Sequence, residues 1–233
     1  ESESESAQSG TEHFILHLPA GLVDVEERRV PVTLTVPGIH NARNATAALL
    51  AAVMLGVDVE RAAAAATSFL GAARRFQIRG SVNQVTVIDD YAHHPTEIAA
   101  LLDAARRRYP EAGIHVIFQP HLFSRTMFFA REFAEALAKA DDVIVTGIFP
   151  AREKQEDFPT VNPDTIVNEA VKLEHEPADD WIRGVDDMRT AAQMMVMRAH
   201  HGDVIFTVGA GDITQMDPVI LHALEAHRWD CAR

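Results

Sequence analysis

Two segments rich in histidine, arginine and carboxylate follow apolar runs that have the length of buried strands. They are Asp89-Asp90-Tyr91-Ala92-His93-His94-Pro95, after the apolar run 85–88, and Gln119-Pro120-His121-Leu122-Phe123-Ser124-Arg125, after the run 114–118. Carboxylates at a strand end can bind ribose hydroxyls or reach magnesium through water, and an imidazole can donate to a carboxylate. An arginine in the first turn of a helix, beside free backbone N–H groups, can hold a small carboxylate or phosphate. These residue types therefore suit a small anionic ligand or a nucleotide.

Each segment also has a plainer structural interpretation. A polar turn with an Asp cap and Pro95 in the first turn is common at helix starts, and an arginine such as Arg125 is usually exposed to solvent. A zinc site built from His93 and His94 is less favoured than either, because adjacent side chains diverge and no cysteine or third histidine stands at ligand spacing. The sequence therefore predicts no protein metal site.

Two further loops carry weaker signals for a ligand. The segment Gly38-Ile39-His40-Asn41-Ala42-Arg43-Asn44 follows one strand-like run and opens a helix-like one. Asparagine amides can read an adenine edge, although Asn41 would serve equally well as a helix N-cap. The segment Gly209-Ala210-Gly211-Asp212 begins like a dinucleotide fingerprint but has Thr214 at the third glycine position. It is better interpreted as a tight loop near a ligand.

The elements that must position these loops alternate regularly from residue 80 onward. Apolar runs at 85–88, 114–118, 143–146 and 204–208 are separated by helix-like segments. Helices are predicted from Pro95 to about Tyr109, from a cap at Ser124 or a neighbour to Ala140, and from a cap at Asp186 to Gly202. This β-α-β periodicity predicts an α/β fold, a mainly parallel sheet with helices on both faces. In such folds the chemistry lies beyond the carboxyl ends of the strands, where these loops fall.

Residues 1–79 are predicted to form a smaller, partial α/β segment. Strands are expected at 13–18 and 30–36, and helices at 41–55 and 59–69, the second of them capped by Asp58. Two strands and two helices are too few for a complete α/β layer. The boundary between the two parts is therefore predicted between residues 79 and 80.

Composition narrows the classes of function. The chain has 34 acidic and 21 basic residues, for a formal net charge of −13, so it would repel nucleic acid phosphates and anionic membranes. No apolar run approaches the roughly 18 to 20 residues that span a bilayer, and no signal segment is present. The single Cys231 excludes an internal disulfide. A cytoplasmic protein is expected. The Glu-Ser repeats at the start indicate that the chain is part of a longer one.

Taken together, the motifs resemble the muramyl ligase family in their order and spacing. They are Gly38 to Ala45, Arg74-Arg75-Phe76, Asp89 to Glu97, and Phe118-Gln119-Pro120-His121. The double histidine and the Phe-Gln-Pro-His segment are similar to the alanine-adding branch of that family. The tripeptide-recycling branch shares the first motif but usually lacks the second, and it remains an alternative. A stand-alone α/β module that binds a nucleotide or a partner is the alternative outside enzymes.

The resemblance implies a fold, a reaction and its cofactors. A complete chain of the family has a UDP-binding domain, a central ATP-binding domain and a C-terminal Rossmann-like domain. Residues 1–79 would be the tail of the central domain and 80–233 the C-terminal domain, and no Gly-Lys phosphate loop is present. The implied reaction uses ATP and Mg2+ to phosphorylate the lactyl carboxylate of UDP-N-acetylmuramate, after which the amine of L-alanine attacks. The chain alone is expected to be inactive.

The resemblance also implies roles for individual residues. The nucleotide would be held by His40, Asn41 and Asn44 beside the adenine, Arg75 at a phosphate, Asp90 at the ribose, and Tyr91. The alanine carboxylate would be held by His93 and Arg125, with His121 as a further substrate-binding residue. Known relatives carry an arginine where this chain has Leu122, and often a glycine where it has Arg152, which could place a replacement cation nearby.

Overall fold

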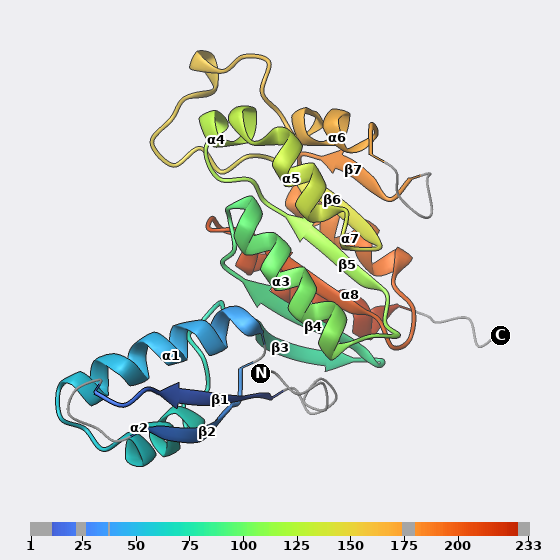
Figure 1. Cartoon of the computed structure of the whole chain (residues 1–233). Helices are drawn as coiled ribbons and strands as arrows, with labels where there is room; N and C mark the ends of the chain where they lie inside the picture. The colour runs from blue at the N-terminus through green and yellow to red at the C-terminus, as the bar shows by residue number, and fades with distance from the viewer. Residues whose placement is uncertain (1–10, 22–26, 37, 174–179, 228–233) are drawn as a thin grey trace. The chain divides into compact units, whose positions relative to one another are not determined.

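The computed structural model describes residues 11–21, 27–36, 38–173 and 180–227, and the chain forms two compact units (Figure 1). The first unit runs to Ala72 and includes Asp103–Pro110. The second comprises Ala73–Leu102 and the chain from Glu111 onward. The boundary predicted at residues 79 and 80 falls inside strand β3 (Gln77–Val82), which pairs within the sheet of the second unit. The division into units therefore lies seven residues earlier than the predicted one, between Ala72 and Ala73.

The first unit is a two-stranded antiparallel ribbon with two helices. Strands β1 (Glu12–Leu18) and β2 (Arg28–Leu34) pair with each other, and they are followed by α1 (Ile39–Met54) and α2 (Val59–Thr67). Asp58 accepts a hydrogen bond from Arg61 N at 3.0 Å, which confirms it as the cap of α2. The buried core side chains are Leu16, Leu18, Val30, Val32, Leu34, Val36, Leu49, Val53, Val59, Ala62 and Ala63.

The second unit contains a six-stranded sheet in the order β3-β4-β8-β5-β6-β7. The strands after β3 are β4 (Val85–Asp90), β5 (Ile114–Phe118), β6 (Asp142–Thr146), β7 (Ile182–Val185) and β8 (Val204–Val208). Every neighbouring pair is parallel except β3 with β4. The predicted mainly parallel sheet is confirmed. The two edge strands, β3 and β7, were not predicted because they lack the continuous apolar run of a strand buried on both faces.

Helices cover both faces of this sheet, as predicted. Figure 1 shows α3 (Pro95–Arg108) and α5 (Ala130–Leu137) on one face, and α7 (Met188–Arg198) and α8 (Asp217–Ala226) on the other. Two further helices, α4 (Phe123–Phe128) and α6 (Asp164–Ala170), are short, and both of them lie beside α5. Among the described residues, no helix is both long and apolar enough to cross a membrane.

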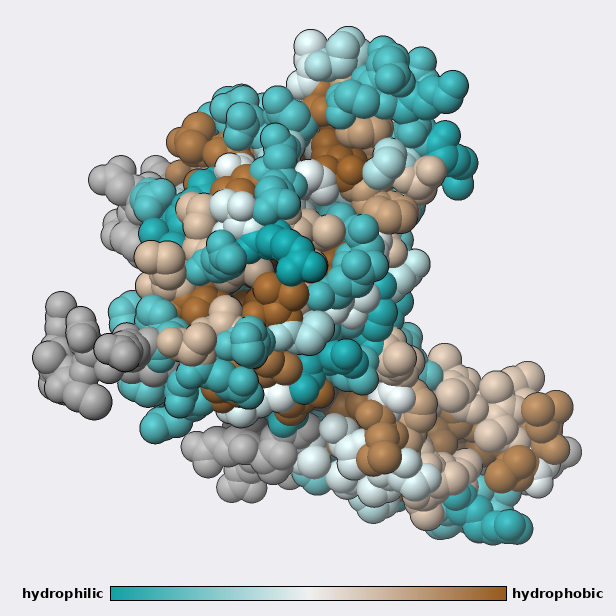
Figure 2. Space-filling view, turned by 180° about the vertical axis from the view of Figure 1, so that it is seen from behind, coloured by the Kyte–Doolittle hydropathy of each residue, from teal (hydrophilic) through white to brown (hydrophobic). Residues whose placement is uncertain are grey.

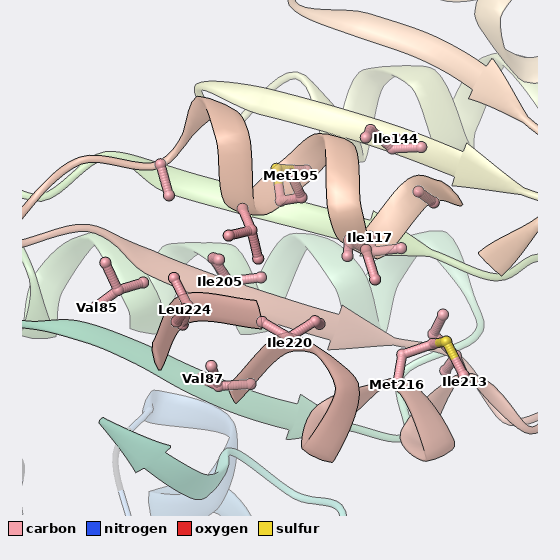
Figure 3. Close-up of a cluster of buried hydrophobic side chains, with 14 residues drawn as sticks. Val85, Val87, Ile117, Ile144, Met195, Ile205, Ile213, Met216, Ile220 and Leu224 are labelled. Atoms are coloured by element: carbon pink, nitrogen blue, oxygen red, sulfur yellow. The ribbon is translucent and has the colours of Figure 1, made fainter. Parts of the chain in front are cut away.

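The core under α7 and α8 is made by alternate residues of the strands (Figure 3). Ile117 and Ile205 point to this face, whereas the next residue of β8, Phe206, points to the opposite face, because successive side chains of a strand alternate. Both isoleucines are fully buried. Each such side chain contributes about 1.5–3 kcal/mol relative to an exposed position, so this layer is a main source of the sheet's stability.

Two predicted helix starts differ from the structure. The segment after Leu122 forms two helices, α4 and α5, and Ser124 does not cap either of them, since its hydroxyl and N–H bind the Glu153 carboxylate instead. Helix α7 is capped by Asp187, which accepts from Thr190 N at 2.7 Å, and it ends at Arg198. Asp186, the predicted cap, lies one residue too early, and its carbonyl accepts from Gly147 N.

Candidate functional site

The loops that carry the candidate residues lie together at one edge of the second unit. Strand β8 pairs with both β4 and β5, and β5 pairs with β6, all in parallel. The carboxyl ends of these four strands therefore meet at the same edge of the sheet. The segments 89–95, 119–125, 147–153 and 209–212 all begin there, as the sequence predicted. This edge is where side chains from distant parts of the sequence can act on one ligand.

The three residues predicted to bind substrate form a cluster at this edge. The rings of His93 and His121 approach edge to face, with centroids 6.0 Å apart. Arg125, on α4, donates from Nη1 to the His93 carbonyl at 3.3 Å. We call His93, His121 and Arg125 the carboxylate cluster below. Its members come from the loops after β4 and β5, so the topology brings them together although they are up to 32 residues apart.

His121 has a buried ring nitrogen. Its ring stacks on Phe149 at 5.7 Å, and its Nδ1 is buried without a hydrogen-bond partner among the described residues. Burial lowers the pKa of His121, and the positive charges of Arg125 and Arg152 act in the same direction. The imidazole is therefore neutral near pH 7. A buried polar atom without a partner is uncommon in folded proteins and marks a position where a ligand or water can bind.

The proton position on His93 follows from its neighbours. Its Nδ1 lies 3.0 Å from the Tyr91 carbonyl oxygen and 3.3 Å from Glu97 Oε2. Both oxygens can only accept, so neutral His93 carries its proton on Nδ1 and presents Nε2 as an acceptor. Glu97 also accepts from the His93 backbone N–H at 3.0 Å and so fixes the start of α3.

Tyr91 and Arg75 lie beside each other on the exposed side of this edge. The Arg74 guanidinium lies 5.0 Å and that of Arg75 5.9 Å from the centre of the Tyr91 ring, within the range of a cation–π contact. Arg75 Nη1 is 3.8 Å from Glu97 Oε1, and half of its side chain is exposed. Arg75 is therefore held over an aromatic surface but keeps donors that can bind a phosphate.

Asp90 is occupied by backbone donors. Its carboxylate accepts from Phe76 N at 2.7 Å and from Ala92 N at 2.8 Å, and only 5% of the residue is exposed. Burial raises the pKa of Asp90, and these two N–H groups act in the opposite direction. The carboxylate ties residues 74–76 to the end of β4. A contact with a ribose would have to use a remaining lone pair, and it stays a prediction.

The sequence analysis selected Arg75 as a functional residue, but the buried ion pair at this edge is made by its neighbour Arg74. Arg74 Nε is 3.0 Å from the fully buried Asp89 carboxylate, and its Nη groups donate to the carbonyls of Gly209 and Gly211 at 2.6 and 3.2 Å. Asp89 also accepts from Thr214 Oγ1 at 3.0 Å. These bonds join the segment before β3 to the ends of β4 and β8. In the sequence, the two adjacent arginines Arg74-Arg75 and the two adjacent aspartates Asp89-Asp90 were the signal that could have indicated this ion pair.

The glycine loop after β8 is confirmed as a tight loop. Gly209 has φ 149°, and a Cβ there would lie 2.6 Å from the Gln119 carbonyl oxygen. A Cβ on Gly211 would lie 2.7 Å from the Phe149 ring. Gln119 holds the loop from both sides, because its amide donates to Asp212 Oδ1 at 2.7 Å and accepts from Ile213 N at 3.1 Å. Larger residues would push Phe149, and with it the stacked His121, out of place.

The three residues expected beside adenine, His40, Asn41 and Asn44, belong to the first unit. All three lie in the first two turns of α1, where Asn41 and Asn44 are three residues apart and so share one face of the helix. The N-cap of α1 is Gly38, with φ 109°, so the alternative that Asn41 is the cap is wrong. Asn44 is exposed, and His40 and Asn41 are half-buried.

The carboxylates at the sheet edge do not form a magnesium site. Asp89 is bound by Arg74 and Thr214, and Asp90 by two backbone N–H groups. Among the described residues, no group of three His, Cys, Asp or Glu side chains could hold a metal ion. Mg2+ usually binds through one or two carboxylates together with substrate phosphates, and both aspartates are already bound by donors of this chain. No step below depends on the metal.

A mainly parallel sheet with cationic side chains beyond the carboxyl ends of its strands is typical of α/β domains that bind anionic ligands or nucleotides. The family model described as "Mur ligase, glutamate ligase domain" matches residues 74–211, which is more than half of the chain. The chain belongs to the Mur ligase family.

Most of this chain matches its relatives, but the match covers only part of the length of each relative. It is 83% identical over 231 residues to UDP-N-acetylmuramate--L-alanine ligase of Bifidobacterium adolescentis, a match that covers 99% of this chain and 44% of that protein. It is 45% identical over 203 residues to the protein of that name from Renibacterium salmoninarum, covering 87% of this chain and 41% of the relative. The chain thus spans less than half the length of these relatives.

Solved structures show the same fold. The UDP-N-acetylmuramate-alanine ligase of Thermotoga maritima matches with a TM-score of 0.68 and 28% identity, covering 87% of this chain and 41% of that one. A murein peptide ligase from Psychrobacter arcticus matches with a TM-score of 0.66 and 26% identity, covering 98% and 44%. The MurF ligase of T. maritima, solved in complex with ADP, matches with a TM-score of 0.56 at 20% identity, which concerns the fold alone.

Proposed function

We propose that this chain supplies the amino-acid-binding part of an ATP-dependent ligase that joins L-alanine to UDP-N-acetylmuramate. The observation that carries the proposal is the carboxylate cluster, in which His93, His121 and Arg125 meet at the ligand-binding edge of the sheet. The 83% identity to a relative with that name supports this choice of substrates. The predicted cytoplasmic location belongs to the same proposal, since ATP is its energy source.

The proposed reaction has two steps. ATP first transfers its terminal phosphoryl group to the carboxylate of UDP-N-acetylmuramate, which gives ADP and an acyl phosphate. The amine of L-alanine then attacks the acyl carbon, the amide bond forms, and phosphate leaves. For the second step the amino acid must be held by its carboxylate and must lose a proton from its ammonium group.

We assign these two tasks to different members of the carboxylate cluster. Arg125 can bind the α-carboxylate with charge-assisted hydrogen bonds, and His121 can donate to it while remaining neutral. His93 presents Nε2 as an acceptor in its neutral form. We therefore assign His93 to the ammonium group, where it can accept the departing proton, rather than to the carboxylate that the family resemblance implied.

Residues of both units are assigned to bind the nucleotide. Arg75 and Tyr91 supply an exposed cation and an aromatic surface in the second unit, which suit a phosphate and a ring. His40, Asn41 and Asn44 would contact adenine from α1 of the first unit, and Asp90 would support the ribose. Each of these roles predicts a change in the apparent affinity for ATP on substitution, with little change for L-alanine.

The direct test is a chimaera that joins this chain to the N-terminal part of the B. adolescentis relative, replacing the segment that it matches. We expect ADP release and formation of UDP-N-acetylmuramoyl-L-alanine that require both ATP and L-alanine. The 233-residue chain alone should form no product, and product from it would contradict the proposal.

Two other outcomes favour the alternatives. A chimaera that uses an intact tripeptide in preference to free L-alanine would be a tripeptide-recycling ligase, in line with the similarity to the murein peptide ligase. A chimaera that binds ATP but joins neither substrate, while the parent relative is active, would favour a stand-alone nucleotide-binding module.

A further inference from the structure

The loop after β6 runs alongside the segment that carries His121 and Arg125. Leu122 N donates to the Phe149 carbonyl at 2.9 Å, and Phe149 N donates to the Pro120 carbonyl at 2.8 Å. Further along, Ser124 N donates to Glu153 Oε2 at 2.9 Å, and the Ser124 hydroxyl binds the other carboxylate oxygen. Contacts at both ends of the two segments fix their register. Arg152, next to Glu153, is therefore held beside the cluster.

Arg152 differs from the other arginines of this edge because it has no partner. It is exposed, and its guanidinium makes no hydrogen bond or ion pair within the part of the chain that the structure describes. Arg74 is bound to Asp89, and Arg125 donates to the His93 carbonyl. The acidic neighbour Glu153 is already bound to Ser124. All donors of the Arg152 guanidinium are therefore available for a ligand as far as the described residues are concerned.

The local charge balance favours an anion at this place. Burial is the largest cause that lowers the pKa of His121, the positive charges of Arg125 and Arg152 act in the same direction, and the charge of Glu153 acts the other way. Leu122, which follows His121, is buried and contributes no charge. The positive charges of Arg125 and Arg152 repel each other, and a bound anion relieves that repulsion.

We propose that Arg152 is a second cationic anchor for the carboxylate of the amino-acid substrate. Arg125 would bind this group from α4, and Arg152 from the loop after β6, so that each guanidinium can reach a carboxylate oxygen. Ala151 has φ 51°, and this left-handed backbone turn directly precedes the arginine. The inference deepens the proposed function and rests on it, because the anion is taken to be an α-carboxylate.

The kinetic test uses the chimaera with three single variants: Arg152→Ala, Arg152→Lys and Lys154→Ala. Arg152→Ala should raise the KM for L-alanine roughly tenfold, the effect of losing about 1.4 kcal/mol, and change kcat and the KM for ATP less than twofold. Arg152→Lys should recover part of the loss because it keeps the charge. Lys154→Ala removes an exposed cation from the same loop and should leave the KM for L-alanine unchanged.

A binding test on the 233-residue chain makes the inference independent of catalysis. L-Alanine is titrated while the ring signals of His93 and His121 are followed by NMR, and L-alaninamide, which lacks the carboxylate charge, is the matched probe. We expect Arg152→Ala to weaken binding of L-alanine roughly tenfold and to leave binding of L-alaninamide unchanged. An equal loss for both probes, or no perturbation by L-alanine in the parent chain, overturns the inference.

The two proposals fail differently. If the chimaera forms no L-alanine-dependent product, the proposed function fails, and the binding titration still decides the role of Arg152. If the chimaera is active but Arg152→Ala has an unchanged KM for L-alanine, or the same change as Lys154→Ala, the anchor is wrong and the proposed function stands.

Discussion

The two units differ in how much apolar surface they cover. In the second unit, every residue of β5, β6 and β8 is buried, because helices pack on both faces of the sheet. In the first unit, Leu55 is 85% and Leu70 86% exposed, and Met54, Val57 and Phe69 are also exposed. Figure 2 shows many tan and brown atoms on the visible face of the first unit, whereas teal predominates on the second.

This difference has a simple physical cause. A two-stranded ribbon is marginal in water, and it needs further strands or helices against one face to become stable. Helices α1 and α2 are rich in alanine, and each alanine buries little area when it packs. The six-stranded sheet instead buries Val, Ile and Phe on both faces. The second unit therefore has the core of an independent domain, and the first has only a small one.

The first prediction tests this comparison at the level of whole units. Residues 73–233, expressed alone, should unfold in one cooperative transition, whereas residues 1–72 alone should show none. Circular dichroism during urea titration measures both. The shorter chain 80–233 is a matched control that removes Gln77–Arg79 from β3, so it should be less stable than 73–233. A cooperative transition in 1–72 would remove the difference between the units.

The second prediction compares one leucine from each unit. Leu224 of α8 is fully buried, and Leu70 of the first unit is 86% exposed. Leu224→Ala should lower the free energy of unfolding by about 2–5 kcal/mol, the cost of a buried cavity, whereas Leu70→Ala should change it by no more than about 0.5 kcal/mol. Denaturant unfolding of both variants is the measurement. A large loss from Leu70→Ala would mean that this side chain is covered in solution.

The same contrast explains which elements the sequence could predict. The central strands β5 and β8 were predicted to the residue, because a strand buried on both faces must be apolar throughout. The edge strands β3 and β7 were missed, since half of the residues of β3 are exposed, β7 has only four residues with a single fully buried one, and each strand contains a glycine. Helix α8 was also missed, although its Asp217-Pro218 start is a typical helix beginning.

For the candidate site, the sequence predicted the loops but not the bonds between them. The rule that ligands bind beyond parallel strands was enough to bring His93 and Arg125 together. The pairing of Ser124 with Glu153 and the burial of Arg74 against Asp89 depend on tertiary packing. Neighbouring residues of the same type, such as Arg74 and Arg75, cannot be distinguished from their position in the chain alone.

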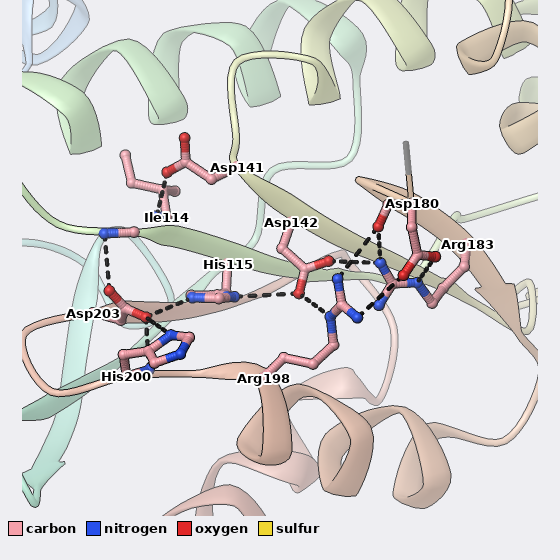
Figure 4. Close-up of polar contacts among 10 residues, drawn as sticks. Ile114, His115, Asp141, Asp142, Asp180, Arg183, Arg198, His200 and Asp203 are labelled. Carbon is pink, nitrogen blue, oxygen red and sulfur yellow. Dashed lines mark hydrogen bonds and ion pairs between the residues drawn. The ribbon is translucent and has the colours of Figure 1, made fainter. Parts of the chain in front are cut away.

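A buried charge network lies at the opposite, amino-terminal edge of the same sheet (Figure 4). His115 binds Asp142 through Nδ1 at 3.3 Å and Asp203 through Nε2 at 2.8 Å. Arg183 and Arg198 also contact Asp142, at 2.9 and 2.8 Å. Burial alone lowers the pKa of His115, but the hydrogen bonds and charges of the two aspartates outweigh it and raise the pKa to about 9. This network joins the starts of β5, β6 and β8.

The third prediction concerns the pH dependence that this network gives to the second unit. The pKa of His115 rises from 6.5 to about 9 on folding, so its contribution is complete below pH 6.5 and is lost as the pH rises through about 9. The contribution is at most about 3 kcal/mol at 1.36 kcal/mol for each pKa unit. His115→Gln should remove this loss between pH 6.5 and 9 in residues 73–233, as measured by urea unfolding at several pH values.

The control for the network is another histidine of the same unit. His222 on α8 is 84% exposed, so His222→Gln should leave the alkaline loss of stability unchanged. The pKa values of Asp142 and Asp203 are lowered, because the hydrogen bonds that they accept outweigh their burial. Their contribution is present above pH 3.8 and is lost as the pH falls through their folded pKa values. A flat profile for the parent chain between pH 6.5 and 9 would contradict the proposed charge of His115.

The last prediction asks whether one residue from each unit affects a different substrate. In the chimaera, Arg125→Ala should raise the KM for L-alanine about ten- to 150-fold, since a charge-assisted hydrogen bond contributes about 1.5–3 kcal/mol. Asn44→Ala, on α1 of the first unit, should raise the KM for ATP only several-fold and leave L-alanine unaffected, because an exposed neutral amide contributes less. Steady-state kinetics with each substrate varied separately measures both effects. Arg131→Ala, which changes an exposed arginine paired with Glu135, is the matched control and should alter neither KM. If Arg125→Ala leaves the KM for L-alanine unchanged, Arg125 is an ordinary arginine at a helix start, and if Asn44→Ala raises the KM for L-alanine, the role assigned to α1 is wrong.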